Sequence, residues 1–82
     1  MTLEAAYKIG YSFSQFVESE TILIGHDGRI SNMKMLDAVS SGIKNNGKSL
    51  LYVGLVPTDV IYSLSGLLNL PGVIITASHI LI

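Results

Sequence analysis

The chain has 82 residues, 13% of them charged, a formal net charge of −1 and no cysteine. This length allows one small domain. The five basic residues are scattered, which argues against nucleic-acid binding, and the lack of cysteine excludes disulfides and thiolate metal sites. No apolar run reaches the roughly 18 residues of a membrane helix, and the first residues do not resemble a signal peptide, so we expect a cytoplasmic protein.

The low charge content is itself informative. Soluble domains carry about 25% charged residues, and small domains expose proportionally more surface than large ones. We therefore expect part of this surface to be covered by other protein, or the isolated chain to be poorly soluble.

Residues 3–17 have the spacing of an amphipathic helix. Thr2 is the predicted N-cap, and Glu4 in the first turn suits the helix dipole. The apolar residues that recur every three or four positions, and so form the expected buried stripe, are Leu3, Ala6, Tyr7, Gly10, Phe13, Phe16 and Val17.

A short apolar run, Thr21–Gly25, lacks polar alternation, which is typical of a strand buried on both faces of a parallel sheet. A loop, His26–Arg29, is expected next. Its Asp-Gly pair is also found in hairpin turns, but residues 29–44 contain no second alternating run. Ser31 is the predicted N-cap of a helix from Asn32 to Asn45, whose expected stripe is Met33, Leu36, Val39 and Ile43.

Two glycines mark this second helix. Gly42 inside it predicts close packing against a neighbour, because glycine there is otherwise destabilising by about 1 kcal/mol relative to alanine. Gly47 is expected in the left-handed conformation just past the helix end.

A second strand, Ser49–Gly54, and a second loop, Leu55–Asp59, follow. Thr58 or Asp59 is expected to cap a third helix that ends near Leu68. The third strand is Gly72–Thr76. The expected buried face of the third helix is Val60, Ile61, Leu64, Leu67 and Leu68.

The alternation αβαβαβ, with one helix in each gap, predicts right-handed crossovers into a three-stranded parallel sheet. The expected fold class is therefore a small three-layer α/β/α unit. In such sheets ligands bind beyond the carboxyl ends of the strands. The loops at that rim contain both histidines, the only arginine and two acids, namely His26, Asp27, Arg29, Asp59 and His79.

Each rim residue also has an ordinary structural explanation. His26 and Asp27 fit a turn, Thr58 and Asp59 fit a helix cap, and Ser78-His79 fits a polar loop. A metal site from the histidines and aspartates has no diagnostic spacing. Adjacent Ser78 and His79 poorly suit a Ser-His-Asp triad, and no glycine-rich phosphate loop is present.

Three segments resemble the α-D-phosphohexomutases, which include phosphomannomutase and phosphoglucomutase. Ile22–Arg29, with Ser31 after it, resembles the first conserved segment of that family. Val53–Asp59 and the Tyr-x-x-Ser-Gly-Leu-Leu run after it resemble the next, closest to the phosphomannomutase branch. Pro71–His79 resembles the start of the active-serine loop, which in the family reads Thr-Ala-Ser-His-Asn-Pro.

The resemblance implies phosphate transfer between C1 and C6 of a hexose phosphate. Ser78 matches the serine that carries the phosphate, and His79 matches its active-site neighbour. His26, Asp27, Arg29 and Ser31 would lie on the substrate rim. The family also implies Mg²⁺, held partly through the phosphate of the serine, and a first strand flanked by the other two.

The chain also departs from the family pattern. Ile80-Leu81-Ile82 replaces the Asn-Pro that follows the histidine, and the aspartate-rich metal loop is absent from these residues. The 82 residues match about half of the first of four domains, without the antiparallel strand that covers the edge of the third strand. We therefore expect residues 1–82 to be a partial N-terminal domain that is inactive alone. The alternatives are a small binding module, a dimer formed through that edge, or a non-functional remnant. The sequence does not separate mannose, glucose and glucosamine as the sugar.

Overall fold

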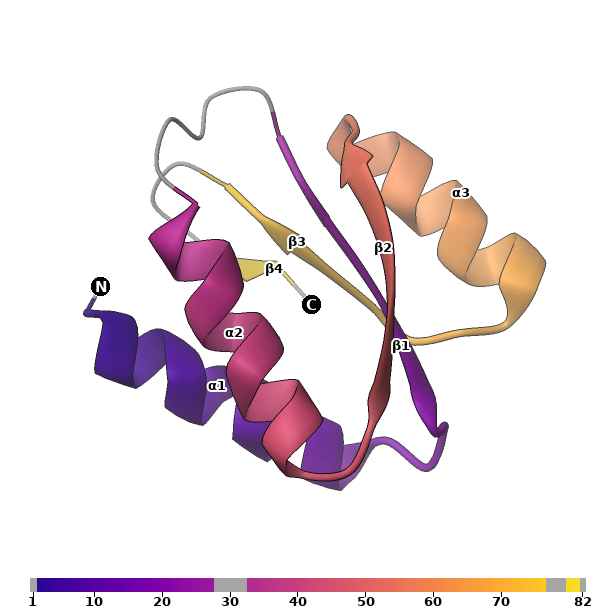
Figure 1. The fold of residues 1–82 in the computed structure, drawn as a ribbon. Coiled ribbons are helices and arrows are strands. Elements are labelled where there is room, and N and C mark those ends of the chain that lie inside the picture. The colour runs from indigo at the N-terminus through magenta and orange to yellow at the C-terminus, as the bar shows by residue number, and fades with distance from the viewer. Residues whose placement is uncertain (1, 28–32, 77–79, 82) are drawn as a thin grey trace.

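The computed structural model describes residues 2–27, 33–76 and 80–81. Helices and strands alternate from α1 to β3, as expected from the sequence, and a further short strand follows (Figure 1). Their bounds are α1 Leu3–Phe16, β1 Thr21–His26, α2 Lys34–Asn45, β2 Ser49–Leu55, α3 Thr58–Leu68, β3 Gly72–Ile75 and β4 Ile80–Leu81.

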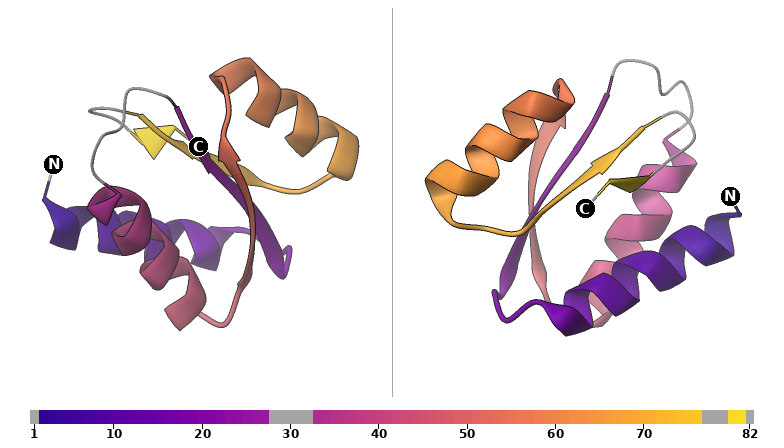
Figure 2. Two further views of the ribbon diagram at one scale, coloured as in Figure 1. Left: turned by 45° about the horizontal axis from the view of Figure 1, so that its top comes forward. Right: turned by 180° about the vertical axis from the view of Figure 1, so that it is seen from behind.

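The sheet has the strand order β2-β1-β3-β4, and β1 pairs in parallel with both β2 and β3. Helices α1 and α2 cover one face, and α3 covers the other (Figures 1 and 2). The predicted three-layer α/β/α class and the central place of the first strand are therefore confirmed. No helix in the described ranges is long and apolar enough to cross a membrane.

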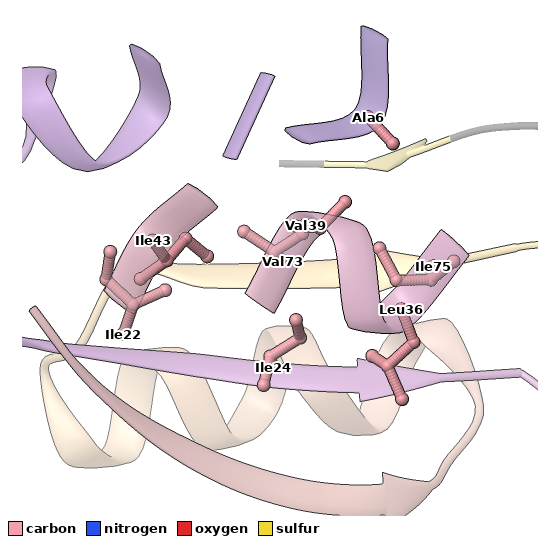
Figure 3. Packing of buried hydrophobic residues seen from close by; sticks show 8 residues of the cluster. All are labelled: Ala6, Ile22, Ile24, Leu36, Val39, Ile43, Val73 and Ile75. Atoms are coloured by element: carbon pink, nitrogen blue, oxygen red, sulfur yellow. The ribbon is translucent and has the colours of Figure 1, made fainter. Parts of the chain in front are cut away.

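β1 can occupy the middle of the sheet because its side chains are apolar on both faces. Ile22 and Ile24 point into the core beneath α1 and α2, and both are almost fully buried (Figure 3). Leu23, between them, packs with Ile61 and Ile74 under α3. Successive strand residues face opposite sides, so only an uninterrupted apolar run can serve two cores at once.

The buried face of α1 agrees only in part with the predicted stripe, of which Ala6 and Gly10 are buried and Phe13 and Val17 pack partly buried against the core. The residues of α1 that are buried are Ala6, Gly10 and Ser14, all small and four positions apart, whereas Leu3 and Phe16 are exposed. The reason is the close approach of α2. A Cβ on Gly10 would collide with the Val39 carbonyl, and a Cβ on Gly42 would collide with the Tyr7 carbonyl. Large side chains cannot occupy such an interface, so the expected tight packing at Gly42 is confirmed.

The helix ends confirm some predicted caps and correct others. Thr2 caps α1, since its Oγ1 accepts from the Ala5 amide at 3.0 Å. α2 begins at Lys34, two residues later than predicted, with Met33 as an N-cap that makes no side-chain bond. The predicted cap Ser31 lies outside the described residues. Gly47 has the expected positive φ of 79°.

α3 is capped differently from the prediction. Pro57 is the N-cap and Thr58 is already inside the helix, without a side-chain capping bond. The proline backbone is extended, with ψ of 154°, and its carbonyl accepts from the Val60 amide at 3.1 Å. Only Ile61 of the predicted apolar face is buried, and Leu67 is 81% exposed, so α3 rests on the sheet by a narrow contact.

The third strand does not leave its outer edge bare, contrary to the sequence-based expectation. β4 pairs antiparallel with it, matching Leu81 to Ile74 and Ile80 to Ile75. The apolar residues in place of Asn-Pro therefore extend the sheet by a fourth strand. β2 occupies the opposite end of the strand order.

Candidate active site

The carboxyl ends of the three parallel strands are joined by backbone hydrogen bonds. The Asp27 amide donates to the Ile75 carbonyl at 3.1 Å, which ties the end of β1 to the end of β3. The Val56 amide donates to the His26 carbonyl at 2.9 Å, which ties the loop after β2 to the same point. The ends of β1 and β3 and the start of the loop after β2 thus lie side by side.

Buried polar residues gather at this rim. The described residues include four buried polar ones, and three of these, His26, Asp27 and Thr76, stand where β1 and β3 end. No buried polar side-chain atom in the described ranges is without a hydrogen-bond partner. Burial of polar groups is unfavourable unless they are hydrogen-bonded, so this rim is organised to hold polar groups inside the domain.

His26 is the last residue of β1 rather than the first residue of a loop, and it is only 9% exposed. Its Nε2 lies 2.8 Å from the Tyr52 hydroxyl, and its Nδ1 lies 3.4 Å from the Asp27 carbonyl oxygen. The His26 and Tyr52 rings are nearly parallel, with centroids 5.9 Å apart. Both imidazole nitrogens therefore have partners within the protein.

Tyr52 is the residue that sequence reasoning missed. It lies on β2, and its side chain is 53% exposed even though its hydroxyl reaches the buried His26. One feature of the sequence could have indicated it: Tyr52 carries a hydroxyl group among the apolar residues of β2. The structure places it in register with Ile24 of β1. A buried histidine two positions beyond Ile24 needs a polar partner on the same face of the sheet.

The described residues do not assemble a metal centre. No group of three His, Asp or Glu side chains within the described ranges could hold a metal ion. Asp59 is exposed in the first turn of α3, where its charge suits the helix dipole, and Asp27 is buried. Arg29, Ser31, Ser78 and His79 lie outside the described residues, so their predicted roles stay predictions.

Comparison with known proteins now decides the family. The family model described as phosphoglucomutase/phosphomannomutase, alpha/beta/alpha domain I, matches residues 1–80. The chain belongs to this family. The layers described above are those of its first domain, and the resemblance of the sequence motifs is confirmed at the level of the phosphohexomutase family.

Several relatives in the family are phosphoglucosamine mutases. One from Prochlorococcus marinus (strain MIT 9515) is 40% identical over 81 residues, which cover 96% of this chain and 18% of the relative. Another, from Thermotoga maritima, is 32% identical over 79 residues with the same two shares, 96% and 18%. The chain therefore spans about a fifth of the length of these phosphohexomutases.

Proposed function

We propose that this chain supplies the active-serine part of a phosphohexomutase site, with Ser78 as the residue that carries the phosphate. The observation that supports this most is the place of the Thr76-Ala77-Ser78-His79 run. Thr76, its first residue, is buried at the rim where β1 and β3 end, and Ala77, Ser78 and His79 follow it in the sequence. In open α/β sheets this rim is where ligands bind.

The proposed reaction is an internal phosphate transfer in two halves. A sugar hydroxyl oxygen attacks the phosphorus of phosphorylated Ser78, the Oγ–P bond breaks, and Oγ receives the hydroxyl proton. The bisphosphate then turns around. Ser78 Oγ attacks the phosphorus at the other end, and the departing sugar oxygen takes the proton back. Phosphate, proton and enzyme are thus all restored.

The chain's other rim residues would stabilise charge during transfer. His79 is adjacent to the phosphate carrier, and the Arg29 guanidinium suits bidentate binding of a phosphate. Donors aimed at the transferring oxygens lower the barrier because negative charge spreads over them. The family implies Mg²⁺, but the described residues hold no ligand cluster. We assign this chain one contribution to that ion, an oxygen of the Ser78 phosphate.

The substrate class in this proposal is a hexose 6- or 1-phosphate. The phosphoglucosamine mutases among the relatives make glucosamine phosphate the first to test, with mannose and glucose phosphates as alternatives. A cytoplasmic location belongs to the same proposal. Because the chain spans 18% of such a relative, we also propose that residues 1–82 alone form a partial first domain that accepts phosphate without completing turnover.

The test is phosphorylation of the purified chain by glucosamine 1,6-bisphosphate, followed by intact mass and fragment analysis. We expect one phosphoryl group on Ser78 and none in Ser78→Ala, while Ser63→Ala, a matched change on the exposed side of α3, is labelled normally. No label, or a label elsewhere, contradicts the serine assignment. In a coupled mutase assay, turnover above background contradicts the proposed inactivity.

A second candidate function is a self-associating module. The supporting observation is the apolar surface of the β2 and α3 region, where Leu51, Leu55 and Leu67 are exposed. β4 already pairs with β3, which moves the expected dimer contact from that edge to β2. Sedimentation across a range of protein concentrations tests this. A dimer that dissociates in Leu55→Lys supports it, and a monomer at every concentration refutes it.

A further inference from the structure

Two aromatic side chains on neighbouring strands, His26 and Tyr52, meet at the rim beside a bulge in the β1–β2 pairing. Ile24 pairs with Tyr52, but the next pairs are Gly25 with Gly54 and His26 with Leu55, so β2 carries one extra residue. Gly54 has a positive φ of 78°, which bends the strand there. Bulges re-aim side chains beside functional sites. Tyr52 precedes the bulge, and its pairing with Ile24 places it diagonally opposite His26.

The hydrogen-bond partners of His26 decide which nitrogen carries its proton. A carbonyl oxygen can only accept, so Nδ1, 3.4 Å from the Asp27 carbonyl oxygen, can form a hydrogen bond there only when it carries the proton. The neutral ring then has a lone pair on Nε2. The Tyr52 hydroxyl, 2.8 Å away, is the donor that satisfies it.

We propose that Tyr52 is a positioning residue for this rim. Its hydroxyl donates to Nε2 and holds His26 as the Nδ1–H tautomer, and His26 in turn fixes the Asp27 carbonyl at the start of the segment that leads to Arg29. Tyr52 thus acts on the phosphate-binding rim through His26. The link to phosphate binding rests on the proposed function, whereas the tautomer does not.

Hydrogen bonds from three segments hold His26 and Asp27 at the rim. The Asp27 amide is held by the Ile75 carbonyl, and the His26 carbonyl is held by the Val56 amide. The His26 side chain adds a further link, and β2 supplies its partner through Tyr52. A change of tautomer removes the Nδ1 proton and with it the bond to the Asp27 carbonyl.

The variant that isolates the hydroxyl is Tyr52→Phe, which keeps the ring beside the imidazole. Tyr62→Phe is the matched control, because Tyr62 is similarly exposed, at 58%, on α3. Histidine labelled with ¹⁵N reports the tautomer by long-range correlation spectra at mildly alkaline pH, where imidazole groups are neutral. His79→Gln identifies which signals belong to His26.

We expect the Nδ1–H form in the unsubstituted chain and in Tyr62→Phe. In Tyr52→Phe the ratio should move about fivefold toward the Nε2–H form, the factor that corresponds to one hydrogen bond of ordinary net strength. An Nε2–H histidine in the unsubstituted chain overturns the proposal even if the variant does not fold. An unchanged ratio in Tyr52→Phe overturns it as well.

Titration with glucosamine 6-phosphate separates this proposal from the proposed function. We expect shifts at the Gly28 and Arg29 amides, with binding about fivefold weaker in Tyr52→Phe than in Tyr62→Phe. No binding by any of the proteins contradicts the proposed function, and the tautomer measurement then decides the role of Tyr52. Equal binding by both variants contradicts the positioning role at the phosphate rim.

Discussion

The contact between α1 and α2 gives the sharpest test of the packing. At Gly42 an added Cβ would meet the Tyr7 carbonyl oxygen and, at 2.8 Å, the Tyr11 amide nitrogen. Both atoms belong to the α1 backbone and cannot rotate away as a side chain can. Gly42→Ala therefore forces the two helices apart above a core that includes Ala6, Val39 and Ile43.

The net effect is a difference between two terms. Alanine in place of glycine stabilises a helix interior by about 1 kcal/mol. Overpacking a core destabilises by about 1–3 kcal/mol, and the rigid backbone contacts at Gly42 place this case near 3 kcal/mol. We expect Gly42→Ala to lower the free energy of unfolding by about 2 kcal/mol. For a domain of this size that lowers Tm by roughly 10 °C.

A second helical glycine provides the matched control for Gly42→Ala. Gly66 lies in α3 with nothing within 4 Å of the position that an added Cβ would take, so Gly66→Ala should show only the helix gain of about 1 kcal/mol. Urea unfolding followed by far-ultraviolet circular dichroism measures all three proteins. The expected order of stability, from highest to lowest, is Gly66→Ala, the unsubstituted chain and Gly42→Ala. If Gly42→Ala proves as stable as Gly66→Ala, the close helix crossing is wrong.

Three smaller predictions use the same measurement. Thr2→Ala removes the cap bond to the Ala5 amide and should destabilise by about 1 kcal/mol, whereas Thr2→Ser should not. Ile24→Ala empties a site that is 1% exposed and should destabilise by about 3 kcal/mol, while Leu67→Ala, 81% exposed, should stay within about 0.5 kcal/mol. Gly54→Ala has open space but a φ of 78°, so backbone strain alone should lower stability by about 1 kcal/mol, and no loss would contradict that backbone geometry.

The order of elements could be predicted because it depends on local pattern. Each strand is a short apolar run, each helix has three- or four-residue spacing, and glycine or asparagine marks the breaks. The predicted stops at Asn45 and Leu68 are confirmed. The prediction that the first strand is central came from the family resemblance. The structure agrees with it, because β1 is buried on both faces of the sheet.

Which face of a helix is buried was harder to predict, because a close helix contact can require small residues rather than hydrophobic ones. In α1 the close crossing selects small size, so Ser14 is buried while Phe16 is 87% exposed. Ser14 tolerates burial because its hydroxyl donates to the Tyr11 carbonyl at 2.7 Å and accepts from the Asn46 side chain at 2.9 Å. Neither partner is visible from the sequence pattern of α1 alone.

At the rim, too, the sequence predicted where functional residues lie but not which partners they have. Chemistry-bearing residues could be assigned to the carboxyl ends of the strands, since parallel pairing fixes where those ends meet. Whether a histidine there is available to a ligand depends on its partners. His26 is engaged by Tyr52 because β2 is in register with β1 so that Tyr52 pairs with Ile24, diagonally opposite His26. The register of β2 against β1 has no clear mark in the sequence.

The low charge content of the chain is matched by an apolar surface on one part of the molecule. The α1 and α2 layer closes over the core, whereas β2 and α3 expose large apolar side chains, among them Leu51, Leu55, Tyr62 and Leu67. α3 buries only Ile61 against the sheet. Since the matched segment is 18% of the length of such a relative, a surface of this kind fits the expectation that further protein covers it. The exposed apolar side chains of β2 and α3 are therefore consistent with the proposal that residues 1–82 form a partial first domain.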